Sequence, residues 1–162
     1  MEVQWITPMN WIMHRKRLLA FALKHGDKRI TADSLKLFGR IDPAELAHPY
    51  SSRTAVAVVR EGGRLLGLAA AINGGKDACL VIVHPDSRRQ GIATLLLGSL
   101  RSKLGGLSCH VAADNMASIS ACLRAGMAAV HVVTGATGKP TLCFEGHSSA
   151  GAGIKPRIRR RR

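Results

Sequence analysis

Acidic residues are scarce in this chain. Its 162 residues include 10 Asp and Glu against 24 Lys and Arg, which gives a formal charge of +14 with histidine neutral. A field of this sign repels free cationic amines and attracts polyanions such as nucleic acid, a ribosome or the phosphates of a small ligand. The alternative interpretation is that the basic surface only keeps the protein in solution. We favour a polyanionic partner, because both ends of the chain and its body share the excess.

Six of these cations lie at the C-terminal end, and we expect them to contact nucleic acid: Lys155, Arg157, Arg159, Arg160, Arg161 and Arg162. The residues just before them are small, so residues 148–162 are predicted to form a flexible basic tail. Residues 1–147 are predicted to form one domain, which is long enough to bury a hydrophobic core.

Long apolar runs and paired cysteines are also missing. No apolar segment approaches the length that spans a bilayer, and the first residues lack the layout of a signal peptide, so we expect a cytoplasmic protein without a membrane partner. None of the cysteines stands at zinc-ligand spacing with histidine, and we therefore expect reduced core thiols and no metal site. These cysteines are Cys79, Cys109, Cys122 and Cys143.

The most informative segment runs from Val81 to Ala93. An apolar run ends at Val83, a His-Pro break follows, and a basic turn containing Gly91 then leads into a series of good helix formers. The N–H groups of such a turn and the dipole of the following helix point the same way, so they favour a bound anion. The segment therefore predicts a phosphate-binding turn. The alternative is an ordinary strand–helix connection with solvated basic residues.

This segment resembles the pyrophosphate-binding turn of the GNAT superfamily of N-acetyltransferases, whose pattern is Arg/Gln-x-x-Gly-x-Gly/Ala after a strand. Arg88, Gly91 and Ala93 fill its three fixed positions. The resemblance implies that acetyl-CoA is the acyl donor. It also implies that this segment supplies most of the coenzyme-binding residues: Val81, Ile82, Val83, Arg88, Arg89, Gln90, Gly91, Ile92, Ala93 and Thr94.

A second segment agrees with the resemblance, which covers roughly residues 55–144. A predicted strand over 107–113 is followed by Asp114-Asn115, a plausible cap for a helix over 116–125. By its position, Asn115 inherits the hydrogen bond that the family makes to the pantetheine arm. Asn115, Ser118 and Cys122 share one helix face at i, i+3 and i+7, so all three are predicted to contact the coenzyme.

Cys122 departs from the family pattern, which often has at this position a Tyr that protonates the departing thiolate. A cysteine has a reference pKa of about 8.5, close to that of the coenzyme thiol, so we expect proton transfer between them to be near thermoneutral. Cys122 is therefore a candidate catalytic acid, with Ser118 or water as substitutes. The alternative is that this cysteine packs as a small hydrophobe.

Acetyl transfer also needs a donor for the developing oxyanion and a base for the amine. The resemblance places the oxyanion donor, a backbone N–H, near Val83. No acidic residue faces a substrate from the strand over 79–83. The remaining candidates for the base are Asp77, Asp114, Glu45, His84 and His110, each of which is more often structural, and His110 is expected in the core. Candidates for lining an acceptor site, or for packing, are Trp5, Trp11 and Tyr50.

The pattern of apolar residues and turns predicts an α/β (α+β) fold. We expect helices over 10–25 and 32–38, a helical turn over 43–47, and an antiparallel meander of strands over 53–59, 64–72 and 77–83. A helix over 90–104 leads to a strand over 107–113 that should lie parallel to the preceding one, and a last strand pair covers 129–133 and 141–144. The resemblance implies a mixed, mostly antiparallel sheet flanked by helices, with one parallel pair splayed around coenzyme A.

Two classes of function remain open. The first is an N-acetyltransferase whose acceptor is a primary amine on or near a nucleic acid or ribonucleoprotein, such as a modified base, an aminoacyl RNA or a ribosomal protein. The second is a non-catalytic protein of the same fold that binds nucleic acid through its tail. A small-amine acetyltransferase is a further alternative, which fits the basic surface less well. The sequence is compatible with a monomer or a homodimer.

Overall fold

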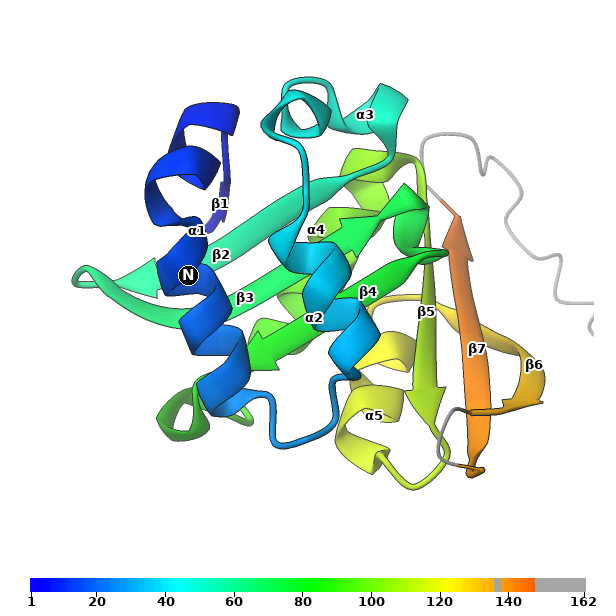
Figure 1. The fold of residues 1–162 in the computed structure, drawn as a ribbon. Coiled ribbons are helices and arrows are strands. Elements are labelled where there is room, and N and C mark those ends of the chain that lie inside the picture. Colours follow the sequence, from blue (N-terminus) through cyan, green and yellow to red (C-terminus); the bar gives the residue numbers. More distant parts are fainter. Residues whose placement is uncertain (136–137, 148–162) are drawn as a thin grey trace, which may run out of the picture.

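Two antiparallel sheets make up the framework of this protein (Figure 1). The computed structural model describes residues 1–135 and 138–147, so the predicted basic tail lies outside the described residues. The first sheet has the order β1 (Val3–Trp5), β2 (Ala55–Glu61), β3 (Arg64–Ile72) and β4 (Ala78–Val83). The second has the order β5 (Gly106–Ala112), β7 (Pro140–His147) and β6 (Ala128–Thr134).

Helices cover both faces of the first sheet (Figure 1). Helices α1 (Pro8–His25) and α2 (Ala32–Gly39) pack on one face, and α4 (Ile92–Leu104) packs on the other. Helix α5 (Met116–Arg124) follows β5 and packs against α4. The short elements are α3 (Pro49–Ser52) and the 3₁₀ turns η1 (Pro43–Leu46), η2 (Asn73–Gly75) and η3 (Pro85–Ser87). No helix in the described ranges is long and apolar enough to cross a membrane.

Alternation along the strands divides the core in two. In β2, Ala57 and Val59 belong to the cluster that contains α4, whereas Val56 and Val58 belong to the cluster under α1 and α2. Successive side chains of a strand point to opposite faces, so a sheet covered on both sides has apolar residues at every position. Glycine brings α4 close to this sheet, because a Cβ on Gly67 would lie 2.6 Å from Cγ2 of Ile92.

The order of the elements agrees with the sequence-based prediction, and the meander joined by glycine turns is confirmed. Strand β1 and helix α3 were not predicted. His110 was wrongly placed in the core: it is exposed, since it alternates with the buried Cys109 and Val111 on β5.

The predicted parallel pair is not confirmed as a hydrogen-bonded ladder. Within the described ranges, β4 and β5 belong to separate sheets that have no ladder between them. The strands approach closely near their beginnings, where Gly75, just before β4, lies against the Ser108 carbonyl of β5. From there they point in different directions (Figure 1). The separation between the two strands, called the gap below, increases toward their ends, and the turn that precedes α4 follows the end of β4 (Figure 1).

Candidate active site

The predicted phosphate turn lies between the end of β4 and the start of α4. Arg89 and Gly91 both have positive φ angles, of 64° and 80°, and together they reverse the chain into the helix. Gly91 is the N-cap residue of α4, and no side chain caps this end. The first N–H groups of a helix have no intrahelical partners, so the amides of residues 92–94 present donors and the positive end of the dipole to an anion. Among the residues that the structure describes, a Cβ on Gly91 would meet no atom within 4 Å, so the approach is open.

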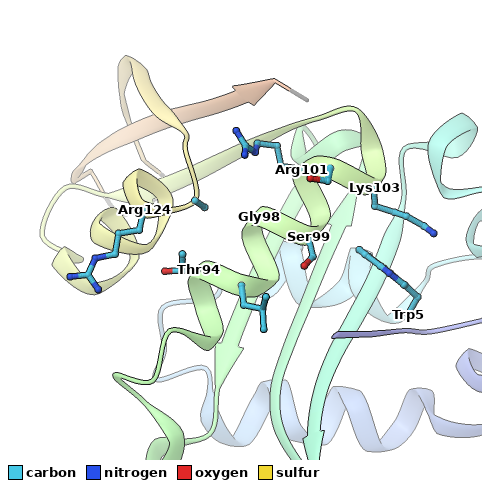
Figure 2. Close-up of a pocket in the computed structure, with 10 residues that line it drawn as sticks. Trp5, Thr94, Gly98, Ser99, Arg101, Lys103 and Arg124 are labelled. Carbon is cyan, nitrogen blue, oxygen red and sulfur yellow. The ribbon is translucent and has the colours of Figure 1, made fainter. Parts of the chain in front are cut away.

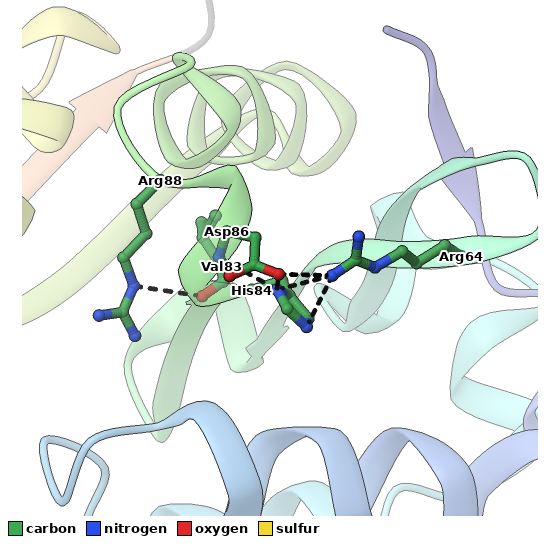
Figure 3. Close-up of polar contacts among 5 residues, drawn as sticks. All are labelled: Arg64, Val83, His84, Asp86 and Arg88. Atoms are coloured by element: carbon green, nitrogen blue, oxygen red, sulfur yellow. Dashed lines mark hydrogen bonds and ion pairs between the residues drawn. The ribbon is translucent and has the colours of Figure 1, made fainter.

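Arg88 ties this turn to the end of α1. Its guanidinium forms an ion pair with Asp27 and donates a hydrogen bond to the His25 carbonyl at 3.5 Å. Its Nε donates to the carbonyl of Val83, also at 3.5 Å (Figure 3). Arg88 therefore fixes the turn relative to α1, while Arg89 and Gln90 are exposed beside Gly91.

The predicted coenzyme contacts on β4 divide between its two faces. Val81 and Val83 are half-buried against the α4 side, whereas Ile82 is buried on the α1 side. The N–H of His84 donates to the carbonyl of Leu66 on β3 at 2.7 Å. Because successive amides along a strand point to opposite edges, the N–H of Val83 points away from β3 and toward the gap. This orientation suits the predicted oxyanion donor.

The start of α5 follows the end of β5. Asn115 is the N-cap of α5, and its Oδ1 accepts a hydrogen bond from the Ser118 N–H at 3.3 Å. The oxygen of this amide is therefore engaged in capping, and its NH₂ group is the part suited to donate to a pantetheine carbonyl. Ser118 is half-buried on the same helix.

Cys122 lies in the core, with 1% of its surface exposed. The neighbouring Cys109 thiol, followed by burial, raises the pKa of the Cys122 thiol far above its ordinary value. A thiol with so high a pKa is a poor proton donor to a coenzyme thiolate. The catalytic role of Cys122 stays a prediction, and this geometry favours the packing alternative.

Asp114, the other side-chain candidate for catalysis, is exposed and paired with two cations. Lys139 and Arg29 contact its carboxylate at 3.1 Å and 3.0 Å, and their hydrogen bonds lower its pKa. A lowered pKa makes a carboxylate a weaker base. Asp114 therefore joins β5 to the chain after α1, and its catalytic role stays a prediction.

Sequence reasoning missed a cluster of rings beside Val83. His25 at the end of α1 faces His84, with ring centroids 4.6 Å apart, and Phe21 packs edge-on against His25. Arg64 of β3 contacts the His84 ring and forms an ion pair with Asp86 at 2.9 Å (Figure 3). No signal in the sequence links His25 to His84, because 58 other residues separate them.

The aromatic acceptor candidates are not brought together. Trp11 is fully buried and donates from Nε1 to the Ile41 carbonyl at 2.9 Å, so it is a packing residue. Tyr50 is exposed on α3. Trp5 lies on β1 at one end of an open groove that follows the outer side of α4 (Figure 2).

Two sheets that diverge beside an uncapped helix start form a site that suits a nucleotide-linked diphosphate. The chain matches the family model of the acetyltransferase (GNAT) domain over residues 27–117, more than half of its length. The protein therefore belongs to the GNAT family of acetyltransferases, for which acetyl-CoA is the acyl donor. No curated protein matches it in sequence.

Solved structures of low sequence identity share the fold. The ribosomal-protein-alanine N-acetyltransferase from Brucella melitensis is 19% identical with a TM-score of 0.62, covering 91% of this chain and 99% of its own. A spermidine N-acetyltransferase chimera from Vibrio cholerae and hSSAT is 13% identical with a TM-score of 0.61, covering 92% and 97%. The aminoglycoside acetyltransferase AAC(6′)-Ib, in complex with coenzyme A and kanamycin, is 11% identical with a TM-score of 0.53, covering 90% and 93%.

Proposed function

We propose that this acetyltransferase modifies a primary amine that is carried on or near a nucleic acid or a ribonucleoprotein. The observation that carries the proposal is the charge of the chain, +14 with histidine neutral. A free polycation meets a repulsive field, whereas an amine attached to phosphate-rich material is drawn toward the protein. The relative named for a ribosomal-protein alanine is compatible with such an acceptor.

The proposed reaction forms a C–N bond between the amine and the acetyl carbonyl carbon and breaks the C–S bond of the thioester. The amine gives up one proton to solvent, and the departing coenzyme thiolate takes one up. Bound acetyl-CoA supplies the activated acyl group. The protein holds its diphosphate at the uncapped start of α4, and the N–H of Val83 stabilises the negative charge on the carbonyl oxygen. Positioning of the two reactants accounts for much of the rate.

The basic tail is the second part of this proposal. We infer that residues 155–162 add sequence-independent contacts to phosphates, which strengthens the capture of the acceptor. Removal of these residues should leave the coenzyme affinity unchanged, and it should weaken RNA binding and flatten its dependence on salt. Equal RNA binding by the shortened chain would reduce the tail to a solubilising segment.

The decisive experiment is an acceptor survey with release of the coenzyme thiol as the readout. We would compare spermidine, an aminoglycoside, basic peptides with a free N-terminus, ribosomal proteins, aminoacyl RNA and amine-modified DNA at matched amine concentration. We expect the acceptors bound to nucleic acid or ribosomes to react fastest, and their advantage should shrink as salt is raised. A fastest reaction with spermidine or an aminoglycoside would overturn the proposal and favour a small-amine acetyltransferase.

A further inference from the structure

An open groove runs along the side of α4 that faces away from the first sheet. Figure 2 shows Arg124 near one end and Trp5 with Lys103 at the other, with the helix between them. Three elements line the groove: β1, α4 and the end of α5 with the residue after it. The lining residues are Trp5, Thr94, Leu95, Gly98, Ser99, Arg101, Ser102, Lys103, Arg124 and Ala125.

The charge of this groove has one sign. Arg101, Lys103 and Arg124 contribute three cations, and its lining contains no Asp or Glu. Arg101 is held in place, because its Nη1 donates to the Gly126 carbonyl at 3.4 Å and its stem lies next to Gly146. Arg124 is exposed, and Lys103 is exposed with its ammonium beside the Trp5 ring. Such a row of cations suits a chain of phosphates better than a single carboxylate.

An aromatic platform stands beside these cations. Trp5 is half-buried, and the Lys103 ammonium lies 5.2 Å from the centroid of its ring. This cation–π contact fixes the ring at the groove. A nucleobase can stack on an indole in the same way, since every base has a π-face. Trp11, by contrast, is fully buried and unavailable to a ligand.

A glycine in α4, Gly98, makes the groove deeper than a larger residue would. Gly98 lies in the middle of α4, where glycine costs about 0.5–1 kcal/mol relative to alanine. Packing against the described part of the chain does not explain this residue, because a Cβ there would meet no atom of that part within 4 Å. The neighbouring Ser99 and Ser102 are also small, and their hydroxyls can donate to phosphate oxygens. The helix therefore admits a polymer backbone close to its own.

We propose that this α4 groove binds a single strand of nucleic acid, with phosphates on Arg101, Lys103 and Arg124 and one base stacked on Trp5. The inference deepens the proposed function, because it names the surface that would hold the acceptor's polyanion. The groove reaches Thr94, in the first turn of α4, so a strand bound there passes close to the phosphate turn at Gly91. Binding itself does not depend on acetyl transfer, so the two proposals can fail separately.

The test is fluorescence anisotropy of a labelled RNA strand of about 12 nucleotides with the full-length protein. The groove variant Arg101→Gln/Lys103→Gln/Arg124→Gln is compared with Lys16→Gln/Lys36→Gln/Arg40→Gln, which removes the same charge from the α1 and α2 side. We expect at least a tenfold loss of affinity for the groove variant, and a salt slope lowered by about 2. The control should lose less than threefold. Equal losses would mean that only the overall charge attracts RNA, and would overturn the proposal.

Stacking is tested at Trp5. Trp5→Ala should weaken binding about fivefold or more, whereas Trp5→Phe should retain most of the affinity but lose the quenching of intrinsic fluorescence by RNA. Both variants must keep the thermal shift given by acetyl-CoA, which shows that the fold and the donor site are intact. Unchanged RNA affinity in Trp5→Ala would remove the stacking platform from the proposal.

A last measurement separates RNA from the nucleotide arm of the coenzyme. Saturating coenzyme A, or adenosine 3′,5′-bisphosphate, is added to the protein–RNA complex. We expect the RNA to remain bound with its affinity changed by less than threefold. Stoichiometric displacement of the RNA would assign the groove to the coenzyme and overturn the proposal.

Discussion

The imidazole rings of His25 and His84 face each other across the junction of α1 and β4, with their centroids 4.6 Å apart. Burial, followed by the charges of His84, Lys24 and Arg88, lowers the pKa of His25 below its ordinary value of 6.5, while Asp27 opposes this shift. The native state therefore favours the neutral His25 ring.

This shift has a definite sign for stability. Because the unfolded chain binds the His25 proton more readily, the free energy of unfolding should rise as the pH increases through about 6.5. His25→Gln should flatten this rise between about pH 5 and pH 8, as measured by urea unfolding. His131→Gln, on the exposed strand β6, is the matched control and should follow the wild-type curve. If His25→Gln showed the same pH dependence of unfolding free energy as the wild type, the proposed effect of the His25 pKa would be contradicted.

Gly91 provides a test of the donor site. Gly91→Ala places a methyl group in open space and adds about 1–2 kcal/mol of backbone strain, so it should keep the rise in melting temperature given by acetyl-CoA. Gly91→Glu carries the same strain and adds a carboxylate at the anion site, and this variant should lose that rise. Thermal unfolding with and without saturating acetyl-CoA compares the two. If acetyl-CoA raised the melting temperature of both variants equally, the diphosphate would not bind at this turn.

A substitution at Cys122 distinguishes a packing role of this residue from a role as catalytic acid. Because the thiol is buried next to Cys109, we expect Cys122→Ala to lower the free energy of unfolding by about 1–2 kcal/mol. Turnover per folded molecule should stay at the wild-type value. Cys143→Ala, at a half-buried position of β7, is the control and should cost less. A several-fold fall in turnover at unchanged coenzyme affinity would support the acid role of Cys122.

Gly75 maintains the close approach of β4 and β5. Its φ of 87° strains any other residue, and a Cβ would overlap the Ser108 carbonyl. Gly62, with φ 55° and open space around it, is the matched control. Gly62→Ala should lower the free energy of unfolding by about 1–2 kcal/mol. Gly75→Ala should lower it by a further ~1–3 kcal/mol, because the added methyl group overpacks the contact. If denaturant unfolding showed equal losses of stability in the two variants, the contact between Gly75 and Ser108 would not contribute to stability.

Local patterns were sufficient for most of the fold. The glycine turns and apolar runs predict the hairpins of β2, β3 and β4, and the series from Val83 to Thr94 predicts a strand, an open turn and a helix start. Each of these signals lies within a few consecutive residues. Strand β1 escapes prediction because three residues show no periodicity, and it depends on pairing with β2.

The side-chain arrangement at the site is a long-range property. The pairing of Arg88 with Asp27, and of His25 with His84, depends on where α1 ends relative to β4. Likewise, the burial of Cys122 depends on Cys109 of β5, which no spacing within α5 reveals. The sequence was therefore enough to predict the turn between β4 and α4, whereas the burial of Cys122, the ion pairs of Asp114 and the α4 groove became known only from the structure.

The separation of β4 from β5 lowers the cost of admitting an extended ligand. In the part of the chain described, no ladder joins the facing edges of these strands. The extended pantetheine arm of the coenzyme can therefore enter without breaking backbone hydrogen bonds between them. Helix α4, anchored to both sheets, sets the width of the opening in place of interstrand bonds. Such an arm can therefore be admitted while both sheets keep their strand pairing.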